Sequence, residues 1–312
     1  MNKRKIVMVG CGYVGATSIF SMMSGGACNQ IVVIDRNTEK ATGDVMDMND
    51  GISFLHPTTL TVGDYAECRD ADIVVITAGA SQLPGQTRND LLAANVKIFK
   101  NILDQVIPNI GENTIILVVT NPVDALTYFT QQYTGLPVGR VLGSGTALDT
   151  ARLKYAIAQH ARIDARDIHT FVIGEHGDTS VAAFSATNIA GLSLQEYCSQ
   201  CQSCTDILTV GLENHVREAA YEIIQKKGAT FYGVALTVGR IVEAILQNQK
   251  AILTVSTQLD GQYDLHDVSL SLPCIIGSSG VERVLTPPLN DEEFQALHAS
   301  ARAIQSNISN TR

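Results

Sequence analysis

Three glycines near the N-terminus place the strongest constraint on what this chain can fold into. Gly10, Gly12 and Gly15 occur in the segment Gly10-Cys-Gly-Tyr-Val-Gly15, directly after the continuous apolar run Ile6–Val9 and before a helical pattern. Such an apolar run is typical of a strand that is buried on both faces. In a strand–turn–helix unit the first glycine allows a tight turn, the second lets the main chain approach a pyrophosphate, and the third permits close helix–strand packing. The motif therefore predicts a dinucleotide-binding unit.

An acidic residue supports this interpretation and indicates which dinucleotide is bound. Asp35 closes the next apolar run, Ile31–Ile34, twenty residues after Gly15. A carboxylate there accepts the ribose hydroxyls of NAD and would repel the 2′-phosphate of NADP, although the adjacent Arg36 weakens that preference. The predicted cofactor-binding residues are Gly10, Gly12, Tyr13, Val14, Gly15, Asp35, Thr77, Ala78, Gly79 and Asn121.

The first half of the chain alternates strands and helices. Ile73–Ile76 and Ile115–Val119 are further continuous apolar runs, and Asp90–Val106 has apolar residues at helical spacing. This alternation predicts an α/β fold with a doubly wound parallel sheet of the Rossmann type, over residues 1–145.

After about residue 145 the pattern changes, which predicts an α+β domain over residues 146–312 with antiparallel strands. The expected elements are helices over Ile207–Gln225 (closed by Gly228), Phe231–Gln247 and Leu289–Ile308, and strands over Ala251–Ser256 and Val268–Leu272.

Composition excludes some partners and indicates the compartment. The net charge of −9 makes nucleic acid and anionic membrane surfaces unfavourable partners, so an anionic substrate needs a local basic site. The basic N-terminus precedes an apolar run too short for an export signal, and no run is long enough to span a membrane. Seven scattered cysteines favour reduced thiols in the cytoplasm, and the spacing from Cys198 to Cys204 lacks the second ligand pair of a zinc site, so no metal is expected.

Candidate catalytic residues lie in three separate segments. Reduction of a keto acid by a dinucleotide needs a proton donor, a cation at the carbonyl oxygen and a cation for the substrate carboxylate. His176 stands between glycines in Gly174-Glu-His-Gly-Asp178, and Asp149 and Arg152 share a helix face at i and i+3. The loop that ends in Arg88 contains glycine and proline and is able to close as a lid. Taken singly, the histidine, the ion pair and the loop are each compatible with purely structural roles.

Taken together, these segments resemble the L-lactate/malate dehydrogenase family over essentially the full chain, and most closely the bacterial members that act on lactate. The shared motifs are Gly10–Gly15 with Asp35, Gln82–Arg88, Thr120–Asp124, Gly143–Arg152, Gly174–Asp178 and Lys227–Thr230. The resemblance implies a homotetramer, or less often a dimer. It also implies that His176 is the proton donor and acceptor, Asp149 its partner, Arg152 the ligand of the substrate carboxylate and Arg88 the group that polarises the carbonyl. Asn121 is then expected to contact the reacting oxygen and the nicotinamide, and Thr230 to line the substrate pocket.

Position 82 is expected to select the substrate. Family members that act on malate resemble this loop but carry arginine there, whereas Gln82 is neutral. A second carboxylate buried against Gln82 would lack a counter-charge, so pyruvate and (S)-lactate are favoured over oxaloacetate and malate. Leu83 and Gln86 depart from the usual pattern of lactate-specific members, which leaves the tolerance of longer 2-keto acids open.

The resemblance also suggests regulation. Many bacterial members are activated by fructose 1,6-bisphosphate, bound by a basic residue two after the carboxylate-binding arginine and a histidine seven before the catalytic one. Those positions are Lys154 and His169. A solvated lysine and a strand-edge histidine are the alternative interpretation.

Three other functions compete with this one. A malate or branched 2-hydroxyacid dehydrogenase would use the same residues, and Gln82 argues only weakly against the branched substrate. An NAD-dependent glycosidase would need a metal-binding Cys/His set near the nicotinamide. A non-catalytic dinucleotide-binding protein would have no reason to keep His176, Asp149, Arg152 and Arg88 together.

Overall fold

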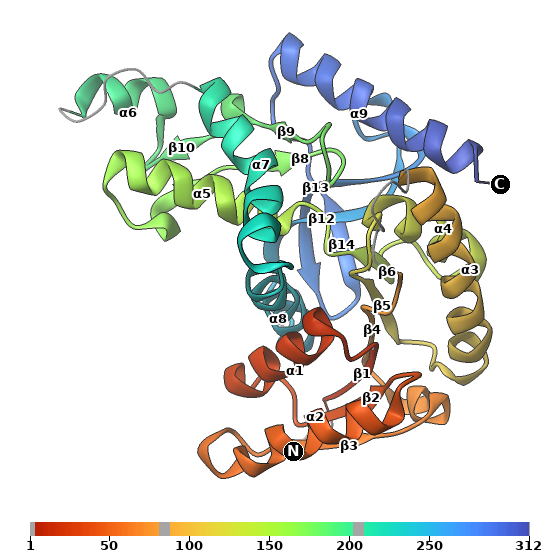
Figure 1. The fold of residues 1–312 in the computed structure, drawn as a ribbon. Coiled ribbons are helices and arrows are strands. Elements are labelled where there is room, and N and C mark those ends of the chain that lie inside the picture. Colours follow the sequence, from red (N-terminus) through yellow and green to blue (C-terminus); the bar gives the residue numbers. More distant parts are fainter. Residues whose placement is uncertain (1–3, 81–87, 202–208, 312) are drawn as a thin grey trace.

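The computed structural model describes residues 4–80, 88–201 and 209–311, which form an α/β fold around one large mixed sheet (Figure 1). The sheet has the strand order β14-β13-β12-β6-β5-β4-β1-β2-β3. Its strands are β1 (Lys5–Val9), β2 (Gln30–Ile34), β3 (Thr59–Val62), β4 (Ile73–Ile76), β5 (Ile115–Val118), β6 (Val141–Gly143), β12 (Ala251–Asp260), β13 (His266–Gly277) and β14 (Gly280–Val284).

The strands β1 to β6 pair in parallel, in the order 3-2-1-4-5-6 that is typical of dinucleotide-binding folds. The helices between them are α1 (Tyr13–Gly25), α2 (Thr38–Asp50), α3 (Arg88–Val106) and α4 (Val123–Thr134). The predicted fold class is therefore confirmed, and the four apolar runs correspond to β1, β2, β4 and β5. Strands β3 and β6 were not predicted, because β3 is partly exposed and β6 has only three residues.

The second half continues the same sheet with antiparallel strands. Strand β12 pairs with β13, and β13 pairs with β14, so the two predicted strands are antiparallel as expected, and they pair with each other. The helices of this half are α5 (Ala147–Ala161), α6 (Leu194–Gln200), α7 (Thr209–Lys227), α8 (Tyr232–Leu246) and α9 (Asp291–Ser309). Two small sheets join β7 (Ile168–His169), β10 (Asn188–Ile189) and β11 (Leu192–Ser193), and β8 (Val172–Ile173) with β9 (Val181–Ala182).

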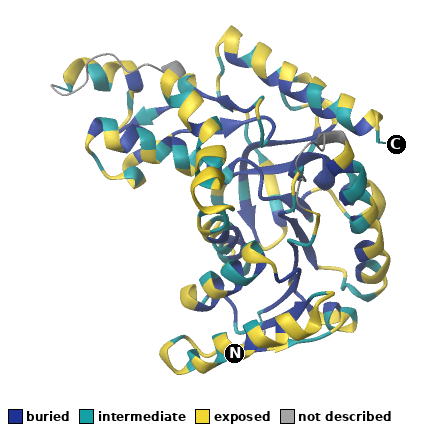
Figure 2. Cartoon of the chain, viewed as in Figure 1, coloured by how far each residue is buried: buried dark blue, intermediate teal, exposed yellow. Residues whose placement is uncertain are grey.

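Both faces of the parallel sheet are buried, which explains the continuous apolar runs. Successive strand residues point to opposite faces, so Val7 and Val74 pack in the cluster that includes residues of α3 and α4. Ile6 and Ile73 pack in the cluster that includes residues of α1 and α8. Figure 2 shows the strands in the colour of buried residues, with exposed residues on the outward sides of the helices. Over the described residues, no helix combines the length and the apolar character needed to cross a membrane.

The parallel and antiparallel halves of the sheet meet at a single residue pair. Gly143 at the end of β6 is the pairing partner of Ser256 in β12. A Cβ atom on Gly143 would lie 2.4 Å from Thr127 Oγ1, 2.9 Å from Val123 Cγ2 and 3.0 Å from Ser256 Cβ. The start of α4 can pack against this joint only because position 143 has no side chain.

We therefore expect Gly143→Ala to destabilise the fold. The added methyl group must displace Val123 and Thr127 of α4 or separate the strands, and overpacking of this kind costs about 1–3 kcal/mol. Denaturant unfolding measures the loss. The matched control is Gly43→Ala in the middle of α2, where a Cβ meets nothing within 4 Å, so stability should stay the same or rise by about 1 kcal/mol. Equal stability of the two variants would contradict the tight packing at residue 143.

Candidate active site

Four of the predicted site segments lie at one edge of the parallel sheet. Gly10 follows β1, Asp35 follows β2, Thr77 follows β4 and Asn121 lies just after β5. Parallel strands bring their carboxyl ends to the same edge, and ligands of open α/β sheets bind there, where the strand order reverses. The reversal occurs between β1 and β4, so the glycine loop and Thr77 flank this point.

The conformation of the glycine loop requires glycine at two positions. Gly10 has φ +106°, and a Cβ there would lie 2.6 Å from Ala78 N. A Cβ on Gly15 would lie 2.1 Å from the carbonyl oxygen of Gly10, which also accepts a 3.0 Å hydrogen bond from Thr77 Oγ1. The loop is therefore packed against the segment Thr77–Ala78, as the predicted roles of the first and third glycines require.

The middle glycine faces open space. Gly12 is the N-cap residue of α1, no side chain caps the helix there, and a Cβ on Gly12 would meet nothing within 4 Å. The first N–H groups of a helix have no partner within the helix, and they favour an anion together with the helix dipole. This end of α1 therefore fits a pyrophosphate.

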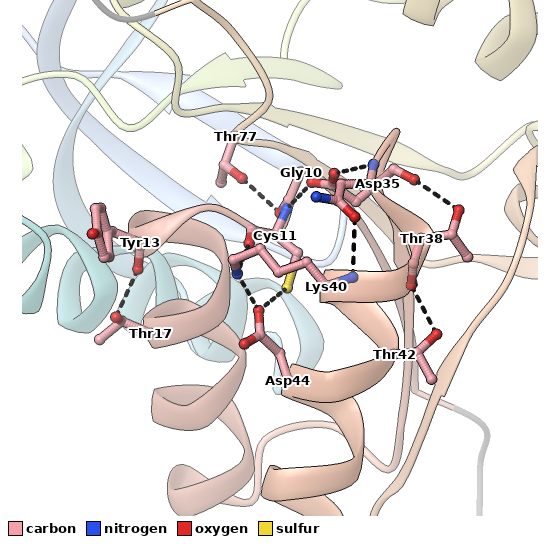
Figure 3. A network of polar contacts seen from close by, with 11 residues as sticks. Gly10, Cys11, Tyr13, Thr17, Asp35, Thr38, Lys40, Thr42, Asp44 and Thr77 are labelled. Atoms are coloured by element: carbon pink, nitrogen blue, oxygen red, sulfur yellow. Dashed lines mark hydrogen bonds and ion pairs between the residues drawn. The ribbon is translucent and has the colours of Figure 1, made fainter.

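Asp35 is held in place by the main chain (Figure 3). Its Oδ2 accepts a 2.6 Å hydrogen bond from Cys11 N, and its Oδ1 accepts a 2.8 Å hydrogen bond from Asn37 N. Each carboxylate oxygen has a further lone pair, which is available to a ribose hydroxyl. Together with Gly12 and the uncapped start of α1, these residues fit a bound NAD.

A lysine and an aspartate of α2 fix the same loop from the other side. Lys40 Nζ donates to the carbonyl oxygen of Cys11 at 3.0 Å and to Asp44 Oδ2 at 2.5 Å (Figure 3). Cys11 Sγ lies 3.4 Å from Asp44 Oδ2, and burial raises the pKa of the Cys11 thiol to about 12, with a further contribution from Asp44. Cys11 is therefore a neutral thiol with a structural place in the loop.

Aromatic contacts connect the cofactor loop to a motif late in the chain. The ring of Tyr13 stacks on Phe231 with 5.4 Å between the centroids, and Lys227 Nζ lies 3.6 Å from the centroid of Phe231. Thr230, the predicted lining residue of the substrate pocket, precedes Phe231 in the segment between α7 and α8. The stack therefore places this segment beside the N-terminus of α1.

Asn95 of α3 connects two other parts of the site, and the sequence had not indicated it. Its Oδ1 accepts a 2.7 Å hydrogen bond from Ala80 N, and its Nδ2 donates to the carbonyl oxygen of Asn121 at 2.8 Å. Thr120 Oγ1 also donates to the carbonyl oxygen of Ala78, at 2.9 Å. A polar residue on the apolar stripe of a predicted helix is the signal that could have revealed Asn95, which is fully buried.

The predicted catalytic histidine, aspartate and arginine lie together. His176 Nδ1 is 2.5 Å from Asp149 Oδ2, and Arg152 NH1 donates to Asp149 Oδ1 at 2.9 Å. The Asp149 side chain is 8 % exposed, whereas those of Arg152 and His176 remain 14 % and 21 % exposed. Asp149 therefore holds the side chains of His176 and Arg152 with one carboxylate oxygen each. Both side chains stay partly exposed, so a ligand can reach them.

The electrostatics of this trio favour an ionised pair. Burial lowers the pKa of His176, but the charge and hydrogen bond of Asp149 raise it above the usual value of 6.5 overall. Burial raises the pKa of Asp149, but His176 and Arg152 lower it below its usual value overall. Such an imidazolium, with Nδ1 held by Asp149 so that Nε2 is the nitrogen that can face a substrate, suits a proton donor near neutral pH.

The loop that carries His176 is held by three main-chain contacts from distant elements. Gly174 (φ +86°) exchanges two hydrogen bonds with Ser271 of β13. Glu175 N donates to Ser300 Oγ of α9 at 2.8 Å, and His176 N donates to Asp124 Oδ2 of α4 at 2.8 Å. The motif Thr120–Asp124 contained Asp124 without indicating any role for it.

Several other residues singled out in the sequence lie outside this arrangement or outside the described residues. Gln82 and the side chain of Arg88 lie outside the described residues, and Arg88 is the first residue of α3. Cys198 lies in α6 and Cys201 follows it, whereas Cys204 is not among the described residues. Within residues 4–80, 88–201 and 209–311, no group of three or more His, Cys, Asp or Glu side chains is placed to hold a metal ion.

The chain is similar to known proteins in both sequence and fold. The profile for the lactate/malate dehydrogenase NAD binding domain matches residues 4–143, and the profile for the alpha/beta C-terminal domain of the same family matches residues 146–312. The L-lactate dehydrogenase of Acetivibrio thermocellus is 49 % identical over 97 % of this chain and 95 % of its own length. L-lactate dehydrogenase 1 of Clostridium acetobutylicum is 47 % identical over 97 % of each chain. The crystal structure of the minor L-lactate dehydrogenase from Enterococcus mundtii has a TM-score of 0.96 at 38 % identity, over 100 % of this chain and 99 % of that one.

We expect Asp149→Asn to lower the pKa of His176 by about one unit or more, because it removes the buried charge that supports the imidazolium. NMR titration of the histidine ring protons measures this, with Asp260→Asn beside the exposed His266 as a matched control that should leave His176 unchanged. Because the folded pKa of His176 is raised, its contribution to stability is present below about pH 6.5 and is lost as the pH rises through the folded value. This part of the pH dependence of unfolding should disappear in the variant. An unchanged titration of His176 would show that Asp149 does not control its charge.

Proposed function

Because the chain belongs to the lactate/malate dehydrogenase family, we propose that it is an NAD-dependent enzyme that interconverts pyruvate and (S)-lactate. The observation that carries the proposal is the trio His176–Asp149–Arg152, which combines a proton donor with a carboxylate-binding cation. A non-catalytic dinucleotide-binding protein has no use for such a trio.

The residues divide the chemistry among themselves. NADH, when bound, supplies the hydride that goes to the carbonyl carbon of pyruvate. The His176 imidazolium donates its Nε2 proton to the carbonyl oxygen and ends as a neutral imidazole, while Asp149 keeps Nδ1 protonated. In the reverse direction the neutral imidazole takes the hydroxyl proton of lactate.

Arg152 holds the substrate by its carboxylate. One guanidinium nitrogen donates to Asp149, so the other N–H groups are available for two parallel hydrogen bonds to the substrate. Arg88 polarises the carbonyl oxygen, and Asn121, at the carboxyl end of β5, contacts the same oxygen and the nicotinamide. Thr230 lines the pocket beside the Tyr13–Phe231 stack.

Gln82 sets the choice of keto acid in this proposal. A neutral amide facing the substrate side chain suits the methyl group of pyruvate, whereas the second carboxylate of oxaloacetate would be buried without a cation. NADH oxidation with pyruvate, oxaloacetate, 2-ketobutyrate and 2-ketoisocaproate compares the candidate substrates directly. The longest of these tests the branched 2-hydroxyacid alternative.

We further propose that the chain assembles as a homotetramer. Phe20, Tyr232 and Leu236 are each more than half exposed, and they line a cavity of about 640 Å³ between α1 and α8. A second copy of the chain that covers this apolar surface would remove it from water. Sedimentation equilibrium distinguishes monomer, dimer and tetramer.

Fructose 1,6-bisphosphate is proposed as an activator that binds Lys154 and His169. Lys154 lies on α5, and His169 is an exposed residue of β7, which packs against α5. Burial lowers the pKa of Lys154, so its ammonium would gain from a phosphate ligand. Pyruvate saturation curves between about pH 6 and 7.5, with and without millimolar effector, test this. Superimposed curves at every pH would remove the effector site and leave the catalytic residues unaffected.

A cytoplasmic location in fermentative metabolism completes the proposal. The cysteines Cys11, Cys28, Cys68, Cys198, Cys201 and Cys274 are all free thiols, as is typical of a reducing compartment. Reduction of pyruvate there would return NAD to glycolysis.

We expect His176→Asn to bind NADH normally but to lower kcat by a factor of about 10² or more, because the proton donor is lost. Single-turnover oxidation of NADH with pyruvate, together with NADH fluorescence titration, separates the two effects. His266→Asn, at an exposed histidine, is the matched control and should keep the kcat of the wild type. Full activity of His176→Asn would assign His176 a structural role.

We expect Gln82→Arg to reverse the substrate preference, because the new guanidinium supplies the counter-charge that oxaloacetate needs. The ratio of kcat/KM for oxaloacetate to that for pyruvate should rise by about a hundredfold or more. Gln86→Lys serves as the control, because it adds a positive charge to the same Gln82–Arg88 segment at a different position. A preference in Gln82→Arg that matched the wild type would exclude residue 82 from the substrate pocket.

A further inference from the structure

A second carboxylate contacts the main chain of His176 from a different element than Asp149. Asp124 occupies the first turn of α4, is 1 % exposed, and accepts a 2.8 Å hydrogen bond from His176 N at its Oδ2. We propose that Asp124 is a positioning residue of the proton relay, which fixes the main chain of His176 and adds negative charge near this residue. This inference rests on the proposed function and deepens it.

The geometry shows that His176 is fixed at two points from two helices. Asp149 of α5 holds the ring at Nδ1 at 2.5 Å, and Asp124 of α4 holds the main-chain N–H at 2.8 Å. With both the ring and the main chain fixed, the direction of Nε2 toward the substrate is determined. Proton transfer depends steeply on such alignment, so a contact that never touches the substrate can still control the rate.

The position of Asp124 also couples the cofactor half of the chain to the proton donor. Asn121 lies just before α4, in the same segment Asn121-Pro-Val-Asp124. It follows the carboxyl end of β5, where the nicotinamide and the reacting oxygen are expected. The start of α4 is held by the tight joint at Gly143 and Ser256. The same short segment therefore carries Asn121 and holds the main chain of His176.

The charge of Asp124 acts on His176 as well. The groups that face Asp124 are His176 and Glu175 of the catalytic loop and Ser256 of β12, while Asp149 and Arg152 face His176 from α5. Burial raises the pKa of Asp124 to about 6. The Ser256 hydroxyl, the main-chain N–H of His176 and the charge of His176 lower this pKa, but they do not outweigh burial. Ionised Asp124 helps Asp149 to raise the pKa of His176. The two carboxylates and the imidazole therefore titrate as a coupled set.

Two substitutions separate the hydrogen bond from the charge. Asp124→Asn keeps an oxygen that can accept the hydrogen bond from His176 N–H, but it removes the charge. The pKa of His176, measured by NMR and from the pH profile of kcat/KM for pyruvate, should fall by about half a unit to one unit, with normal NADH binding. Asp124→Ala removes the acceptor as well, and kcat at low pH should fall about tenfold or more below that of Asp124→Asn.

The control is a matched change at an aspartate of β13 that contacts the same helix. Asp267 accepts a 2.6 Å hydrogen bond from Tyr128 of α4 and makes no contact with His176, so Asp267→Asn should leave kcat and the His176 titration as in the wild type. Thermal unfolding verifies that each variant is folded. A His176 titration in Asp124→Asn that superimposes on the wild type would overturn the proposal, as would wild-type kcat in Asp124→Ala. Failure of the proposed function would show separately, as a wild-type protein that does not oxidise NADH with pyruvate, and the NMR titration would still decide the coupling.

Discussion

Parallel pairing of β1, β2, β4 and β5 is the constraint on which the rest of the molecule depends. It brings the carboxyl ends of these strands to one edge, so Gly10, Asp35, Thr77 and Asn121 become neighbours despite their separation in sequence. It also requires both faces of the sheet to be covered, which fixes where α1, α3 and α4 lie. The catalytic loop then meets this edge through Asp124, at the start of α4.

The proton relay shows how a fold can use buried charge without a large penalty. Asp149 is buried, yet it has two cationic partners, and its pKa is lowered overall. Asp124 is buried and accepts a hydrogen bond from the main-chain N–H of His176 instead of from two cationic side chains, and its pKa is raised to about 6. Both carboxylates are therefore ionised at neutral pH, but Asp124 takes up a proton at a higher pH than Asp149 because their partners differ.

The parts of the structure that were predicted from the sequence are those with a local cause. Gly10 and Gly15 are required by contacts with the adjacent turn, so their spacing alone indicates the loop. The fold class follows from apolar runs whose burial on both faces is visible in the sequence. Asn95 and Asp124 were missed because their roles arise from packing between distant elements, and a single polar residue in a helix has many possible reasons. His176, Asp149 and Arg152 were identified only through their joint resemblance to a family, since each alone is compatible with a structural role.

The contact between Glu175 and Ser300 has a consequence for how the catalytic loop reaches its final geometry during folding. Ser300 lies in α9 and holds the main chain next to His176, while Thr179 of the same loop lies 3.0 Å from Ser300 Oγ. Glu175 and Ser300 are 125 residues apart in sequence, so their contact closes a long segment of chain. The main chain next to His176 is therefore fixed only when α9 packs against the catalytic loop, which makes completion of the catalytic geometry a non-local step of folding.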